Sequence, residues 1–228
     1  GQNFLTDPEV IDATADACSP TEDCTVLEIG PGIGTLTRSL AARYKRVIAL
    51  EVDRSLIPVL RYTLEDCPNV TVVNEDVMQT DLPALLAEAF AAGSVAVCAN
   101  LPYYITTPIL MKLLESRLPF SGITVMVQAE VADRLCAGAG EKAYGAITAV
   151  LNYYARAEEI LFVPADRFVP APKVNSKVIR ITLWQEKPCV PRDEALLFRT
   201  VKAAFGQRRK TLANALATGY PELGKERV

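Results

Sequence analysis

A glycine-rich turn between an apolar strand and a helix carries the clearest binding chemistry in the sequence. Residues 28–35 read Glu-Ile-Gly-Pro-Gly-Ile-Gly-Thr. Glycines let the backbone approach a ligand, and the helix that follows offers unpaired N–H groups. Glu51 ends the next strand, where a carboxylate can accept both hydroxyl groups of a ribose. Asp76 follows the third strand, where it can meet an adenine edge, so the three positions predict an adenosine-containing ligand.

The glycine spacing favours S-adenosylmethionine (SAM) over a dinucleotide. Dinucleotide sites typically show GxGxxG, whereas Gly30, Gly32 and Gly34 form GxGxG. SAM has no pyrophosphate and needs a ribose acceptor, an adenine slot and a pocket that tolerates a sulfonium charge, which acidic residues supply. A nucleotide-dependent oxidoreductase is the alternative from another enzyme class, and a spectral test for bound nicotinamide would separate the two.

A second motif, Asn100-Leu101-Pro102-Tyr103, lies where the fourth strand leaves the sheet. A conjugated amine is a poor nucleophile because its lone pair is spread into the ring. The side-chain oxygen of Asn100 and the carbonyl of Leu101 could accept its N–H bonds and free that lone pair. Tyr103 could stack on a planar base, and Phe168, in a proline-rich loop, could form the other face of a clamp. These residues predict methylation of a nucleobase amine.

The complete absence of histidine excludes several other chemistries. A Ser-His-Asp triad, a Cys-His dyad and an HExxH zinc site all need that residue. The six cysteines form no CxxC pair, so we expect no metal and read them as reduced residues of a cytoplasmic protein. Neither a signal peptide nor a membrane span is evident, and no contact with a membrane is expected.

Strands and helices alternate along most of the chain, which predicts an α/β fold with a largely parallel sheet. The expected strands are 25–29, 47–50, 70–73, 95–99, 123–127, 160–163 and 177–184. The expected helices are one that opens at Asp7, and then 35–43, 55–66, 82–92, 109–116, 143–154 and 194–217. No helix is expected between the last two strands, so that edge of the sheet is read as an antiparallel hairpin.

A proline-containing linker at 185–193 divides the chain. We expect a SAM-binding catalytic domain over 1–187 and the start of a small helical domain over 188–228, whose basic residues suit a nucleic acid. Both ends of the chain are expected to continue beyond this stretch, because it starts without methionine and stops within a helical region.

The net charge of −3 does not by itself indicate a nucleic-acid-binding protein. Basic residues nevertheless gather near the carboxyl end, and they are candidates for contacts with nucleic-acid phosphates: Arg199, Lys202, Arg208, Arg209 and Lys210. A second cluster comprises Arg43, Lys45 and Arg46. The alternative for either cluster is a solvated helix surface.

Taken together, these motifs resemble those of the 16S ribosomal RNA adenine dimethyltransferase family, whose members dimethylate two adjacent adenosines. The matching segments run in the family's order: 1–5 (GQNFL), 28–37 (EIGPGIGTLT), Glu51, 74–76 (NED), 100–103 (NLPY), 127–132 (VQAEVA), 168–174 (FVPAPKV), Ser176 and 205–212 (FGQRRKTL).

The resemblance implies a Rossmann-like SAM-dependent methyltransferase sheet with a reversed last strand, followed by a small helical domain. By the same resemblance, the cofactor site comprises Asn3, Leu5, Gly30, Glu51, Asp76 and Asn100. Asn100 would touch both cofactor and target, while Tyr103 and Phe168 would stack on the flipped base. The implied partner is 16S rRNA, in a 3′-terminal hairpin loop of the small ribosomal subunit or its precursor, and we expect a monomer.

Two alternatives lie close to this family. The first is a 23S rRNA adenine methyltransferase of the antibiotic-resistance type, which shares the architecture; NLPY and FGQRRKTL favour the small-subunit enzyme. The second is a non-catalytic nucleic-acid-binding relative, such as the mitochondrial transcription factors built on this fold. Intact Glu51, Asp76 and NLPY argue against a loss of catalysis.

Overall fold

The computed structural model describes residues 3–18, 21, 23–207 and 209–223. They form two compact units. The first comprises residues 1–132 and 157–183, and the second comprises 133–156 and 184–228. The second unit therefore takes in a segment well before the expected boundary at residue 187, and that boundary stays a prediction.

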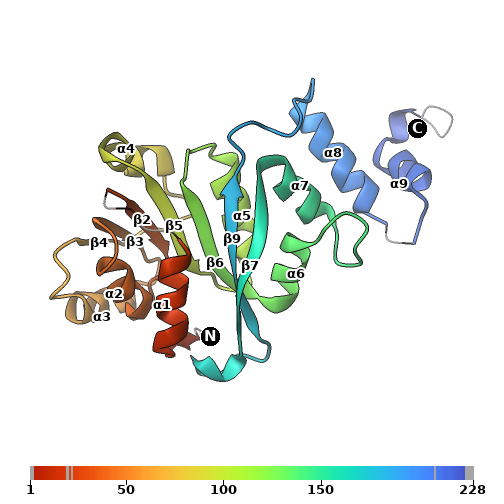
Figure 1. Cartoon of the computed structure of the whole chain (residues 1–228). Coiled ribbons are helices and arrows are strands. Elements are labelled where there is room, and N and C mark those ends of the chain that lie inside the picture. Colours follow the sequence, from red (N-terminus) through yellow and green to blue (C-terminus); the bar gives the residue numbers. More distant parts are fainter. Residues whose placement is uncertain (1–2, 19–20, 22, 208, 224–228) are drawn as a thin grey trace. The chain divides into compact units, whose positions relative to one another are not determined.

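The first unit is built on a seven-stranded sheet (Figure 1). Its spatial order is β4 (Val70–Val73), β3 (Arg46–Leu50), β2 (Thr25–Ile29), β5 (Val95–Asn100), β6 (Gly122–Gln128), β9 (Ser176–Leu183) and β7 (Ala155–Val163). The first five strands are parallel, and β9 runs antiparallel to β6. This confirms the expected Rossmann-like α/β sheet with a reversed last strand.

Parallel order brings four strand ends to one edge of the sheet. Chain connections leave β2 in opposite directions, towards β3 and β4 on one side and β5 and β6 on the other. Such a switch point opens a crevice beyond the carboxyl ends of the strands. The residues that follow β2, β3, β4 and β5 all lie at this edge, and they include the glycine turn, Glu51, Asp76 and the NLPY motif.

The strands are apolar on both faces because helices cover the sheet. Val26, Leu27, Val47 and Val97 have exposed fractions of 0%. Cys98 is also fully buried in β5, two residues before Asn100, which agrees with a structural role.

The helices of the first unit are α1 (Pro8–Ala17), α2 (Thr35–Ala41), α3 (Ile57–Thr63), α4 (Leu82–Ala92), α5 (Thr106–Glu115) and α6 (Ala129–Cys136), of which the last four residues belong to the second unit. A 3₁₀ turn, η1 (Arg54–Leu56), precedes α3, so the helix expected at 55–66 is two shorter pieces. Helix α6 was not expected, because its short amphipathic run directly continues β6. The Asp7 side chain caps α1 by accepting the N–H groups of Glu9 and Val10, as the sequence predicts.

A two-stranded sheet joins distant parts of the first unit. β1 (Phe4–Leu5) pairs antiparallel with β8 (Phe168–Val169), which follows the 3₁₀ turn η2 (Ala165–Arg167). Leu5 lies opposite Phe168 in this pairing. The amino-terminal segment and the proline-rich loop, far apart in sequence, are therefore neighbours.

The second unit is helical and contains α7 (Ala146–Tyr154), α8 (Glu194–Phe205), α9 (Leu212–Gly219) and the 3₁₀ turn η3 (Pro221–Leu223). The helix expected at 194–217 is broken between Phe205 and Leu212. The ring of Phe198 on α8 packs against Tyr153 and Tyr154 on α7, with centroids 5.4 and 5.8 Å apart. Among the described residues, no helix combines the length and apolarity needed to cross a membrane.

Candidate active site

The glycine turn adopts a backbone that side chains disfavour. Gly30, Gly32 and Gly34 have φ angles of 72°, 60° and 91°, in the left-handed region. A Cβ added to Gly30 would meet no atom within 4 Å, so open space lies against the turn there. A Cβ on Gly32 would lie 3.2 Å from Cε1 of Phe4, which shows that the amino-terminal segment lies against the turn.

The amino-terminal segment is anchored on both sides. The carbonyl of Leu5 accepts the hydroxyl of Thr35, 3.3 Å away at the start of α2, and Leu5 itself is buried. The backbone N–H of Thr6 donates to the carbonyl of Arg167 at 3.0 Å. Arg167 also donates from Nη1 to Oδ2 of Asp7, at 2.6 Å. Asn3 is half-buried at the beginning of this anchored segment.

Glu51 is held rigidly at the end of β3. Its Oε2 accepts the N–H of Gly32 at 3.2 Å, and its Oε1 accepts the N–H of Asp53 at 2.8 Å. The exposed fraction of Glu51 is 3%. Each carboxylate oxygen has two lone pairs, so each retains one acceptor position for a hydroxyl group. The side-chain amide of Asn74 donates to the backbone carbonyl of Glu51 at 2.6 Å and ties the ends of β3 and β4 together.

Asp76 organises the loop that follows β4. Its Oδ1 accepts the N–H of Met78 at 2.8 Å. Its carbonyl accepts the N–H groups of Gln79 and Thr80 at 2.8 and 2.9 Å. One carboxylate oxygen thus shapes the loop, while the half-buried side chain keeps further acceptor positions.

A second carboxyl group, that of Glu28, lies beneath the glycine turn. Glu28 is 1% exposed, and its Oε2 has no hydrogen-bond partner among the described residues. Burial is the main cause that raises the pKa of Glu28 to about 8; the nearby charge of Glu51 acts in the same direction, and the Thr37 hydroxyl acts against it. The sequence argument assigned no role to Glu28, although its place two residues before Gly30 made it the one acidic residue inside a buried strand there.

The NLPY motif is positioned by two neighbouring strands. Asn100 is the last residue of β5, opposite Met126, and its side chain is half-buried. The N–H of Leu101 donates to the carbonyl of Met126 at 3.1 Å, which fixes the backbone of the motif. The carbonyl of Pro102 accepts the hydroxyl of Thr106 at 3.0 Å, at the start of α5. The motif is thus a rigid exit from β5 into α5.

The structure places Tyr103 and Phe168 differently with respect to solvent. Tyr103 is half-buried, and its hydroxyl lies 2.8 Å from Oγ of Ser176. Phe168 is only 2% exposed and packs in the core with Leu5 and Met126. Its side chain is buried in this structure, and its role as the second stacking face stays a prediction. The next residue, Tyr104, is 85% exposed.

The predicted RNA-binding residues lie in the second unit, except that Arg208 lies outside the described residues. Lys202, Arg209 and Lys210 are exposed. Arg209 and Lys210 line a pocket of about 620 Å³ beside Thr211, the residue that caps α9. Arg199 is differently placed, because its guanidinium donates to Glu222 at 2.6 Å and lies 4.2 Å from the Tyr220 ring centroid.

The second basic cluster is largely neutralised within the first unit. Arg43 contacts Asp16 at 2.6 Å, Lys45 contacts Asp23 at 3.0 Å, and Arg46 lies 3.6 Å from Glu88. These ion pairs favour the carboxyl-terminal cluster as the phosphate-binding surface.

The fold and the site define a Rossmann-like methyltransferase. A family model described as "Ribosomal RNA adenine dimethylase" matches residues 1–226, and the chain belongs to that family. It is 48% identical over 225 residues to ribosomal RNA small subunit methyltransferase A of Alkaliphilus oremlandii, covering 99% of this chain and 78% of the relative. It is 49% identical over 227 residues to the protein of that name from Bacillus licheniformis, covering 99% and 77%.

Two solved structures share the fold over most of the chain. A dimethyladenosine transferase from Plasmodium falciparum superposes with a TM-score of 0.82 at 26% identity, covering 96% of this chain and 78% of the other. The 23S rRNA methyltransferase ErmE superposes with a TM-score of 0.78 at 29% identity, covering 96% and 85%. The fold is thus shared with a dimethyladenosine transferase and with a 23S rRNA methyltransferase, while the relatives in sequence carry the small-subunit name.

Proposed function

We propose that this protein is a SAM-dependent rRNA adenine dimethyltransferase that methylates the 6-amino groups of two adjacent adenosines in a 3′-terminal hairpin loop of 16S rRNA. The observation that carries this proposal is the edge of the sheet where β4, β3, β2 and β5 end side by side. That edge gathers an adenine acceptor, a ribose acceptor, an open glycine turn and an amine-binding motif. Sequence relatives that share the small-subunit name support the choice of target.

The residues present suit SAM. Open space beside Gly30 accommodates a ligand against the backbone, and Glu51 retains acceptor positions for ribose hydroxyls. Asp76 accepts the adenine amine, and Asn3 and Leu5 cover the site from the amino-terminal segment. When bound, SAM supplies an electrophilic methyl group carried on a sulfonium.

The NLPY motif acts on the target amine. The side-chain oxygen of Asn100 and the carbonyl of Leu101 accept its N–H bonds, which localises the nitrogen lone pair for attack. Tyr103 stacks on the flipped base, and stacking of this kind returns about 1–3 kcal/mol of the unstacking cost. Stacking by Phe168 on the other face requires its ring to leave the core packing. A rigid backbone at this motif supports catalysis by positioning.

In the cell, the substrate is the small ribosomal subunit or its precursor, and the protein acts as a cytoplasmic monomer. Exposed Lys202, Arg209 and Lys210, with Arg208, contact rRNA phosphates, whereas Arg199 supports the fold around Tyr220. Because one rRNA backbone presents many phosphates, binding of the subunit weakens steeply as salt is raised.

The deciding experiment supplies radiolabelled SAM with unmethylated small and large ribosomal subunits in separate reactions. We expect label in adenosines of the small subunit, approaching full dimethylation of two neighbouring nucleotides located by primer extension. Label confined to the large subunit would overturn the proposed target. Wild-type SAM binding with no label in either subunit would overturn the proposed activity.

A further inference from the structure

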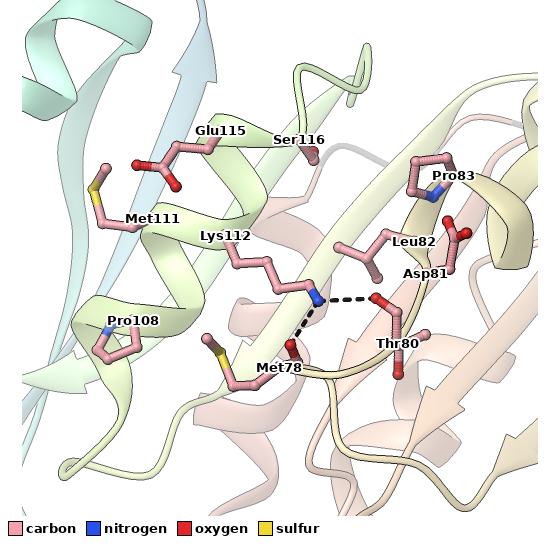
Figure 2. A pocket seen from close by; sticks show the side chains of 10 residues that line it. All are labelled: Met78, Thr80, Asp81, Leu82, Pro83, Pro108, Met111, Lys112, Glu115 and Ser116. Atoms are coloured by element: carbon pink, nitrogen blue, oxygen red, sulfur yellow. Dashed lines mark hydrogen bonds between the residues drawn. The ribbon is translucent and has the colours of Figure 1, made fainter. Parts of the chain in front are cut away.

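Lys112 on helix α5 contacts the backbone of the loop that carries Asp76. Nζ of Lys112 donates to the backbone carbonyl of Met78 and to that of Thr80, each at 2.9 Å (Figure 2). Lys112 is half-buried at one side of a surface pocket of about 470 Å³ between this loop, the start of α4 and α5. Apolar residues occupy the neighbouring positions of α5: Ile109, Leu110, Leu113 and Leu114 are buried.

The two carbonyls belong to the same tight loop that Asp76 shapes from the opposite end. The Asp76 carboxylate accepts the N–H of Met78, and Lys112 then takes the carbonyl of that residue. The Thr80 hydroxyl also donates to the carbonyl of Asp76 at 2.9 Å and to Glu75 at 3.1 Å. Lys112 therefore completes a set of hydrogen bonds that fixes the direction of the Asp76 side chain.

We infer that Lys112 is a positioning residue for adenine recognition, acting through the Asp76 loop. The inference rests on the proposed function, in which Asp76 accepts the adenine amine of SAM. A loop held by charge-assisted hydrogen bonds is already ordered before the ligand binds. Binding then loses less conformational entropy, and the affinity is higher. Helix α5 begins directly after the NLPY motif, so the same helix supports the adenine end and the catalytic end of the site.

The test compares K112M, K112R and E115Q with the unsubstituted chain. Met keeps the apolar stem and removes the ammonium, while Arg restores donors to the carbonyls. Glu115 lines the same pocket, is exposed and lies one turn along α5, so E115Q controls for changes of the pocket itself. Calorimetry measures the Kd for S-adenosylhomocysteine and for its inosine analogue, which lacks the adenine amine.

We expect K112M to raise the Kd for S-adenosylhomocysteine about tenfold, K112R to recover most of the affinity, and E115Q to change little. The decisive quantity is the ratio of the Kd for the inosine analogue to the Kd for S-adenosylhomocysteine. K112M should lower this ratio, because only S-adenosylhomocysteine has the amine that Asp76 accepts. The KM for SAM should rise with little change in kcat. This ratio is independent of the folded fraction, so a less stable variant still reports on it.

If K112M leaves the ratio of the two Kd values unaltered, whether or not both ligands bind more weakly, the inference is overturned and the proposed function stays intact. A wild-type chain that binds neither SAM nor S-adenosylhomocysteine would instead overturn the proposed function, and this inference with it.

Discussion

The hydroxyl of Tyr103 lies 2.8 Å from Oγ of Ser176, so a hydrogen bond joins the NLPY motif to the first residue of β9. This bond fixes the position of the phenolic end of the ring. It also connects the NLPY motif with the segment that follows the proline-rich loop, because Ser176 comes two residues after Val174. We therefore expect the ring and the hydroxyl of Tyr103 to have separable roles, the ring in the proposed stacking and the hydroxyl in orientation.

Substitutions at this pair should separate the two roles. Y103F keeps the ring and loses the bond, so we expect a fall in kcat of only about threefold, whereas Y103A loses stacking worth about 1–3 kcal/mol and should fall about 10–100-fold. Single-turnover methylation of small subunits measures both. S176A should match Y103F, and the double variant Y103F/S176A should be no worse than either. Additive losses would contradict a direct interaction.

Loss of the Asn100 acceptor should affect turnover most. We expect N100A to lower the methylation rate about 10²–10³-fold, the size typical of removing one preorganised polar contact to a reacting group. Rapid-quench assays at saturating SAM and subunit measure the rate, and thermal unfolding checks the fold. Near-wild-type turnover would exclude the amine-activating role of Asn100.

The buried carboxyl of Glu28 should make stability depend on pH. Its pKa rises from 4.5 to about 8 on folding, so the folded state binds this proton more tightly than the unfolded chain. Stability from this group is thus complete below pH 4.5 and is lost as the pH rises towards about 8. E28Q cannot lose a proton, so its stability does not change through this ionisation, whereas wild type loses about 1.4 kcal/mol of stability per pH unit in this window. The Tm of E28Q relative to that of wild type should therefore rise between pH 5 and about pH 8.

Thermal unfolding of the cofactor-free protein across this range measures the effect, with exposed Glu115→Gln as the matched control. A Tm difference for E28Q that is constant with pH would contradict the assignment. Because the sequence has no histidine, no imidazole ionisation obscures this window.

Removal of charge near α9 should weaken RNA binding in a salt-dependent way. For the double variant R209A/K210A we expect weaker binding of small subunits at low salt and a log–log salt slope reduced by about one per residue that contacts phosphate. K45A serves as the matched control, because Lys45 is paired with Asp23. Filter binding over a salt series measures the slope. An unchanged slope for the double variant would place the RNA surface elsewhere.

Sequence periodicity predicted the fold well because the sheet is largely parallel and its central strands are buried on both faces. Strands such as Thr25–Ile29 and Val70–Val73 have the expected bounds, since turn residues end them abruptly. Local pattern could not foresee α6, which follows β6 without a break, nor the β1–β8 pair, whose strands are two residues each and depend on a distant partner.

Some residues of the candidate site could be placed from the sequence, and others could not. Glu51, Asp76 and Asn100 could be placed from the sequence because each follows a strand of one parallel sheet. The burial of Phe168 and the pairing of Arg199 with Glu222 could not, because both depend on contacts between remote segments. Lys112 gave only a weak signal, a single cation within the apolar run of α5.

The pairing of β1 with β8 bears on when the enzyme becomes active during its own synthesis. Leu5 finds its ladder partner only at Phe168, so the amino-terminal strand leaves the ribosome long before the segment that pairs with it. Contacts between residues this distant in sequence form late. A nascent chain therefore lacks the β1–β8 pair, and with it one anchor of the amino-terminal segment beside the glycine turn, until translation has passed the proline-rich loop.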